Sequence, residues 1–165
     1  MAANKSAAYS RNKGARGEVL IRDQLRKATG LGWERTPGSG ALNEKHALKG
    51  DLYIPNEKNF FCVEVKNYKD DHISSKLLTS KKPQISEWWD QCIRQSAKVD
   101  KLPMLFFKFD RSKTFVAFTE ESISFNFAGG LKPSGTYIYY SEEDIYIMQA
   151  EEFLDKNKVR WILTL

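Results

Sequence analysis

The amino-acid sequence predicts an α/β fold in which a central mixed β-sheet is flanked by helices. Three observations support this prediction. Helix-forming and strand-forming patterns follow one another in the order helix, three strands, helix, strands. Two strand connections are hairpins, which are too short to hold the crossover helices of a purely parallel sheet. The chain of 165 residues has room for one compact domain with a single core.

The first helix is expected over residues 13–29, and Gly30 is a typical residue for its C-terminal stop. Residues 1–12 are small, polar and basic without periodicity, so we expect a flexible basic arm there. The rest, residues 13–165, is expected to be one domain. Its core covers about 13–118, and residues 119–165 form a C-terminal extension.

The other elements follow from alternation, turn residues and capping signals. They are a short strand at 33–36 before a glycine-rich turn, a hairpin of 51–54 with 60–68, a helix from the N-cap Ser86 to about Lys98, a second hairpin of 104–109 with 114–118, short strands at 137–140 and 145–148, a short helix at 151–156 and an apolar segment at 159–165.

Composition excludes several classes of protein. Apolar residues make up 41% of the chain and charged residues 28%, as in a folded globular protein. No apolar run approaches the ~18 residues of a membrane span, and the polar N-terminus lacks the apolar core of a secretion signal. Cys62 and Cys92 are too few for a disulfide framework or a zinc site. We therefore expect a cytoplasmic protein.

The positive charge is concentrated in the first third of the chain. Residues 1–49 contain ten bases and four acids, a net charge of +6, which leaves −1 for the remainder of a chain whose total is +5. Such asymmetry indicates a side that faces a polyanion. A basic surface that is merely solvated is the alternative reading, and charge alone does not decide between the two.

Two carboxylates are predicted to meet on the first hairpin. Side chains alternate along the strand 60–68, so Glu64 and Lys66 share one face. Folding the hairpin about its turn places Asp51 opposite Val63 or Glu64. Two adjacent carboxylates repel each other unless a cation lies between them. Oxygen ligands of this kind suit Mg²⁺.

Glu18 supplies a third carboxylate. On a helical wheel it occupies the first position of the apolar stripe formed with Ile21, Leu25 and Ala28. An acid at such a position needs a partner, and a metal or a metal-bound water is one candidate. The alternative is an ordinary acid in the first helical turn that interacts with the helix dipole.

These residues belong to a combination of motifs that resembles the PD-(D/E)XK nuclease superfamily. More narrowly, the combination is similar to archaeal-type Holliday junction resolvases and their phage-encoded relatives. The resemblance covers roughly residues 11–118 and implies a restriction-endonuclease-like core with the order αβββαβ. The motifs are Gly14-x-x-Gly17-Glu18, Arg35-Thr36-Pro37-Gly38-Ser39-Gly40, Gly50-Asp51 and Glu64-Val65-Lys66.

The resemblance also implies roles for individual residues. Asp51 and Glu64 are metal ligands together with the carbonyl of Val65, and Glu18 completes the site directly or through water. Lys66 orients or activates the attacking water, and Ser39 lies near the scissile phosphate.

Two positions depart from the superfamily's pattern or leave it open. Gly50 stands where a proline usually precedes the aspartate. The glutamine of the second helix is assigned to Gln91, with Gln84 and Gln95 left as alternatives.

The function expected from the resemblance is a Mg²⁺-dependent endonuclease of branched DNA, in which Mn²⁺ can substitute. A four-way junction is the expected substrate, a C2 homodimer the expected assembly, and the host cytoplasm the location if the protein is phage-encoded. The phosphate backbone is expected to contact basic residues of the first third, namely Lys5, Arg11, Lys13, Arg16 and Arg35.

Three alternatives remain open at this point. The first is another nuclease of the same fold, with restriction-like, repair or exonuclease activity. The second is a non-catalytic nucleic-acid-binding protein, and the third is an interaction protein with a basic arm. Trp88 and Trp89 could stack on unpaired bases, but core or interface positions are expected.

Overall fold

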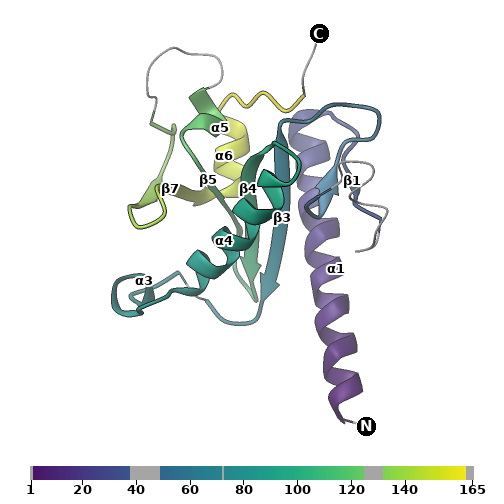
Figure 1. Cartoon of the computed structure of the whole chain (residues 1–165), viewed down its shortest axis with the longest axis vertical. Coiled ribbons are helices and arrows are strands. Elements are labelled where there is room, and N and C mark those ends of the chain that lie inside the picture. The colour runs from purple at the N-terminus through teal and green to yellow at the C-terminus, as the bar shows by residue number, and fades with distance from the viewer. Residues whose placement is uncertain (1, 38–48, 72, 125–131, 163–165) are drawn as a thin grey trace.

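The structure, a computed structural model, describes residues 2–37, 49–71, 73–124 and 132–162. Its helices are α1 (Ala2–Thr29), α3 (Lys76–Thr79), α4 (Gln84–Ala97), α5 (Glu121–Ser124) and α6 (Ala150–Lys156). Its strands are β1 (Glu34–Arg35), β2 (Leu52–Tyr53), β3 (Phe61–Tyr68), β4 (Leu102–Phe109), β5 (Thr114–Phe118), β6 (Tyr137–Tyr140) and β7 (Ile145–Gln149). Figure 1 shows their arrangement.

The strands described form one mixed sheet of seven in the order β1-β2-β3-β4-β5-β7-β6. β3 and β4 are parallel over their whole length, from Phe61 opposite Leu102 to Tyr68 opposite Phe109. The other neighbouring pairs are antiparallel. A parallel pair requires a crossover connection, and the segment that contains α4 supplies it. The predicted α/β class and mixed sheet are confirmed.

Helices cover both faces of the sheet (Figure 1). On one face, Ile21 of α1 and Phe153 of α6 belong to a buried cluster with Val63 of β3. On the other face, the buried side chains of α4 pack against alternate residues of β4. That second cluster includes Trp88, Trp89, Leu105 and Phe107. The expected core position of the two tryptophans is therefore confirmed.

Helix α1 corrects the expected flexible arm, because the helix begins at Ala2 and runs for 28 residues. Residues 5–12 of this helix are mostly exposed, which explains why they carry no apolar periodicity. Alanine, lysine and arginine favour helix even without tertiary contacts, and no proline interrupts the segment. Among the helices described, none is long and apolar enough to cross a membrane.

The second long helix begins earlier than predicted. α4 starts at Gln84, directly after Pro83, whereas Ser86 is a buried residue of its first turn, 3.4 Å from the Tyr140 hydroxyl. Proline is favourable at a helix start, because it lacks an amide hydrogen to satisfy. The short helices α3 and α5 are not predicted by the sequence. The predicted strands up to residue 148 are confirmed, with boundaries that shift by at most two residues.

Candidate active site

Asp51 is held against β3 by two backbone contacts. Its amide donates to the Val63 carbonyl at 2.7 Å, and its Oδ2 accepts a hydrogen bond from the Val65 amide at 2.7 Å. The preceding residue, Gly50, has φ = +83°, and a Cβ there would lie 2.6 Å from the Val63 oxygen. Proline requires φ near −65°. This turn therefore explains why the chain carries glycine rather than the superfamily's usual proline.

Glu64 lies beside Asp51 and is buried, with 4% of its surface exposed. The register of β2 with β3, in which Leu52 faces Val63, brings the two carboxylates together as predicted. Burial, together with the charge of Glu18, raises the pKa of Asp51 to about 6 despite the Val65 hydrogen bond. Burial and the charge of Asp51 raise the pKa of Glu64 to about 7. Ionising both carboxyl groups at the same time is therefore unfavourable in the metal-free protein.

Lys66 lies on the same side of β3 as Glu64, and a residue of α4 holds its side chain. Its Nζ donates to Oε1 of Gln91 at 2.8 Å. Gln84, by contrast, pairs with Glu87 at the exposed start of α4. Of the glutamines in the described residues, Gln91 is the one that lines the cavity containing Lys66. The structure thus brings Gln91 to the candidate site.

Glu18 reaches the site from α1, on the opposite layer. Its Oε2 accepts a hydrogen bond from Nε of Arg35 at 2.7 Å, so a guanidinium compensates its charge. The helix comes very close to β3 at Gly17, where an added Cβ would lie 2.7 Å from Cβ of Asn67. Asn67 also donates from Nδ2 to the Lys13 carbonyl at 2.9 Å. A glycine and an asparagine therefore set the distance of Glu18 from the sheet.

The acidic residues, Lys66, Gln91 and Asn67 line one cavity of about 460 Å³. Glu18, Asp51 and Glu64 contribute its acids, and Lys66 and Gln91 its other central groups. Within the described ranges, no three His, Cys, Asp or Glu side chains lie close enough together to hold a metal ion. Asp51 and Glu64 line this cavity from the hairpin, and Glu18 lines it from α1 while paired with Arg35.

Comparison with known proteins assigns this arrangement to a family. The family described as "Phage putative PDDEXK endonuclease" matches residues 9–164 of the chain. The chain belongs to the phage PDDEXK endonuclease family. This match confirms the superfamily that the motifs predict. Endonucleases hydrolyse phosphodiester bonds within a nucleic-acid strand.

Individual proteins also resemble this PDDEXK chain. Protein D14 of Escherichia phage T5 is 47% identical over 114 residues, which are 67% of this chain and 71% of that protein. Hjc, a Holliday junction resolvase from the archaeal hyperthermophile Archaeoglobus fulgidus, has 16% sequence identity and a TM-score of 0.41. That comparison covers 85% of this chain and 91% of Hjc.

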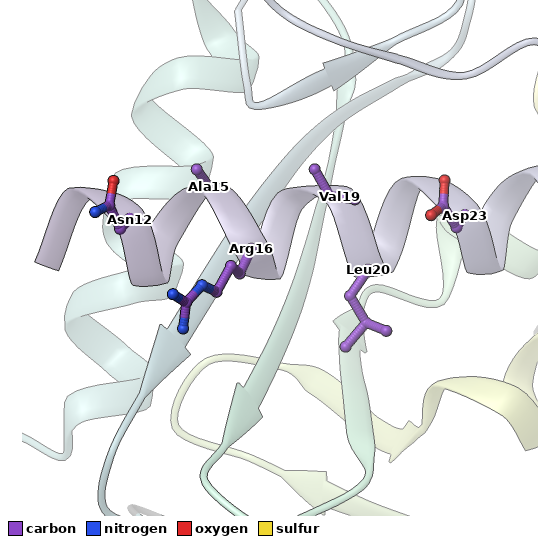
Figure 2. Close-up of a pocket in the computed structure, with 6 residues that line it drawn as sticks. All are labelled: Asn12, Ala15, Arg16, Val19, Leu20 and Asp23. Carbon is purple, nitrogen blue, oxygen red and sulfur yellow. The ribbon is translucent and has the colours of Figure 1, made fainter. Parts of the chain in front are cut away.

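The other predicted site residues of this PDDEXK protein are Ser39 and the bases expected to contact DNA. Ser39 is outside the described residues. Arg16 lines a separate groove on α1, with Asn12, Ala15, Val19, Leu20 and Asp23, as Figure 2 shows. Lys5 and Arg11 are exposed on the same helix. Lys13 lines the central cavity but forms an ion pair with Asp110 at 2.5 Å.

Sequence reasoning missed Asn67 and the aromatic residues of the cavity, Tyr9 and Tyr68. Asn67 directly follows the Glu64-Val65-Lys66 motif, and this adjacency was the available signal. Tyr9 gave no signal, because the segment around it was expected to be an arm. Burial raises the pKa of the Cys62 thiol to about 12, which disfavours the thiolate that a nucleophile requires.

Proposed function

We propose that this protein is a divalent-metal-dependent, structure-specific DNA endonuclease, and that four-way junctions are its substrate. The observation that carries the proposal is the pair Asp51 and Glu64, which face one cavity with Lys66 in a PDDEXK endonuclease.

The donor set fits a hard divalent cation. Asp51 and Glu64 supply adjacent carboxylate oxygens, and burial together with nearby negative charge raises both of their pKa values. We assign these two side chains and the Val65 carbonyl to Mg²⁺, for which Mn²⁺ can substitute. When bound, the cation lowers the pKa of a water molecule and neutralises charge on the phosphate.

The protein's own groups then have distinct tasks. The Lys66 ammonium, positioned by Gln91, orients the attacking water and stabilises negative charge on the phosphoryl oxygens. Glu18 completes the acidic side of the cavity, and its pairing with Arg35 keeps a guanidinium beside it. Ser39, from the glycine-rich turn, contacts the scissile phosphate in this proposal.

The assignment to branched DNA rests on the resemblance of four motifs together to archaeal-type Holliday junction resolvases. A four-way junction has approximate two-fold symmetry, and paired cuts require two active sites. A C2 homodimer is therefore part of the proposal. Lys5, Arg11 and Lys13 extend along α1 from the cavity and contact the backbone, together with Arg35. Arg16 joins them only where the DNA also reaches the groove of Figure 2.

Cleavage of synthetic DNA tests the proposal. A labelled four-way junction and a linear duplex of the same sequence are incubated with the protein in Mg²⁺, in Mn²⁺ and in EDTA. We expect symmetric nicks in the junction with either metal and none in EDTA. Asp51→Asn and Glu64→Gln should each reduce the rate at least 100-fold, whereas the exposed Glu142→Gln should not.

Each other outcome counts against part of the proposal. Equal cleavage of the linear duplex would favour a restriction-like or repair nuclease and overturn the branched substrate. Metal-independent cleavage, or full activity of Asp51→Asn, would overturn the site. Binding without cleavage of any DNA would favour a non-catalytic protein.

A further inference from the structure

The cavity extends well beyond the acidic residues. Its far end is lined by Tyr9 and Ser10 of α1 and by Tyr68 and Lys69 at the end of β3, with Lys13 between the two ends. None of these residues takes part in the hydrolytic chemistry proposed above. A cavity of about 460 Å³ is large enough to hold more than one phosphate group.

The two tyrosines lie at the same end for a geometric reason. α1 and β3 run in opposite directions (Figure 1), and the Asn67–Lys13 hydrogen bond joins them in this register. Tyr9 precedes Glu18 by nine residues, about 13 Å along a helix. Tyr68 follows Glu64 by four residues, about 13 Å along a strand. Both rings are thus displaced from the acids in one direction and by a similar length.

Both rings are accessible from this cavity. Tyr9 is 64% exposed and Tyr68 is 41% exposed, which is unusual for two large aromatic side chains lining one depression. The Tyr68 ring packs on the buried Trp88 with centroids 4.8 Å apart, so the protein core fixes its position. Exposed aromatic surface beside cations is the pattern of single-strand nucleic-acid binding sites.

We propose that this end of the cavity is a subsite for an unpaired nucleobase of the cleaved DNA strand, which stacks on Tyr9 and Tyr68. The inference rests on the proposed function, since it takes the strand that passes the acids to be the ligand. Stacking requires the open face of a base, which a continuous duplex hides between its neighbours. Lys13, whose ammonium also pairs with Asp110, and Lys69 line the same cavity and supply positive charge for the intervening phosphates.

The position of the stacked base follows from the same geometry. A distance of about 13 Å corresponds to about four stacked nucleotides, at 3.4 Å each. The enzyme therefore selects DNA in which the strand is unpaired within about four nucleotides of the cleaved bond. A single-stranded gap meets this condition directly. A four-way junction meets it when base pairs at the branch point open, since stacking is interrupted there, and a fully paired linear duplex does not.

Fluorescence of 2-aminopurine tests the subsite without turnover. The probe is a DNA duplex with a short single-stranded gap that contains 2-aminopurine, and the fully paired duplex of the same sequence is the control. Full-length protein with Asp51→Asn is used so that the DNA is not cut. We expect binding to the gapped probe to quench the fluorescence.

Matched variants identify the stacking side chains. In the Asp51→Asn background, Tyr9→Leu and Tyr68→Leu should each abolish the quench and weaken binding to the gapped probe by roughly 5- to 100-fold. Tyr9→Phe and Tyr68→Phe keep the ring and should retain the quench. Their retention also shows that the leucine variants fail through lost stacking rather than through misfolding. Tyr139→Leu, a similarly exposed tyrosine outside the cavity, is the control.

The subsite is overturned if binding leaves the fluorescence unchanged, or if Tyr9→Leu weakens gapped and paired DNA equally. Failure of the proposed function appears separately, as absence of metal-dependent cleavage by the unmodified protein. Cleavage without quenching therefore removes only the subsite.

Discussion

Asp51 and Glu64 occupy an electrostatically unfavourable position in the metal-free protein. Burial is the main cause of the raised pKa of each carboxyl; the charge of Glu18 also raises the pKa of Asp51, and the charges of Asp51 and Glu18 raise that of Glu64. In the unfolded chain the same groups titrate near their ordinary values of 3.8 and 4.5. The folded state therefore holds protons between about pH 4 and pH 7 that the unfolded state has released.

This difference predicts how stability depends on pH. Because the folded carboxylates have the raised pKa, the unfolding free energy of the metal-free protein falls as pH rises through that range. In EDTA at pH 8, Asp51→Asn should increase the unfolding free energy by about 1–3 kcal/mol. At pH 4 the difference should largely disappear. Urea unfolding at both pH values measures it, and an equal effect at both would contradict the burial of the charged pair.

Gln91 is a positioning residue for Lys66 in this interpretation. Gln91→Ala removes the acceptor 2.8 Å from Nζ, so the ammonium loses its fixed orientation. We expect kcat for junction cleavage to fall about 10-fold, with little change in KM. Lys66→Gln should lower kcat further, by about 100-fold or more. Gln84→Ala, at the exposed start of the same helix, is the control, and a loss of activity equal to that of Gln91→Ala would argue against a specific role for Gln91.

At the scale of elements, the site depends on how closely α1 approaches β3. The helix carries Glu18 and the strand carries Glu64, and Gly17 lies against Asn67 where they cross. Gly14, one turn earlier, has no atom within 4 Å of an added Cβ in the described structure. The two glycines therefore differ in environment although both belong to the same sequence motif.

Alanine substitutions exploit this difference. Gly17→Ala should force the helix away from the strand and destabilise the protein by about 1–3 kcal/mol. It should also reduce cleavage, because Glu18 moves away from Asp51. Gly14→Ala should stabilise by about 0.5–1 kcal/mol, because alanine is the better helix former. Urea unfolding compares them, and similar effects of the two substitutions would show that α1 is not packed as described.

The same elements show which parts of the site could be predicted from sequence patterns alone. The hairpin with Asp51 and Glu64 was predictable because alternation and a turn determine which side chains share a face. The start of α1 was not, because its first residues form a helix by local propensity without contacts that leave a periodic pattern. The pairing of Glu18 with Arg35 also escaped prediction, since it joins two elements whose relative placement depends on tertiary packing.

At the scale of the whole molecule, charge is distributed along α1 rather than in one patch at the acids. Lys5 and Arg11 are exposed on the helix that projects beyond the sheet in Figure 1. Arg35 is paired with Glu18, and Lys13 with Asp110. Lys5 and Arg11 are therefore exposed to phosphates, whereas Arg35 and Lys13 each already pair with a carboxylate.

DNA binding should accordingly depend on salt. For Asp51→Asn protein, the logarithm of the junction affinity should fall linearly with the logarithm of salt concentration. Lys5→Ala and Arg11→Ala should each reduce the magnitude of the slope by about one. Titrations at several salt concentrations measure this slope. An unchanged slope in both variants would exclude these residues from phosphate contact.

Binding of Mn²⁺ measures most directly whether Asp51 and Glu64 form a metal site. Titration of the full chain, followed by electron paramagnetic resonance, should show Mn²⁺ binding that Mg²⁺ displaces. Asp51→Asn and Glu64→Gln should each abolish this binding, and Glu142→Gln should preserve it. Equal Mn²⁺ binding by the unmodified protein and both site variants, or none by any of them, would contradict a metal-dependent nuclease centre at this position.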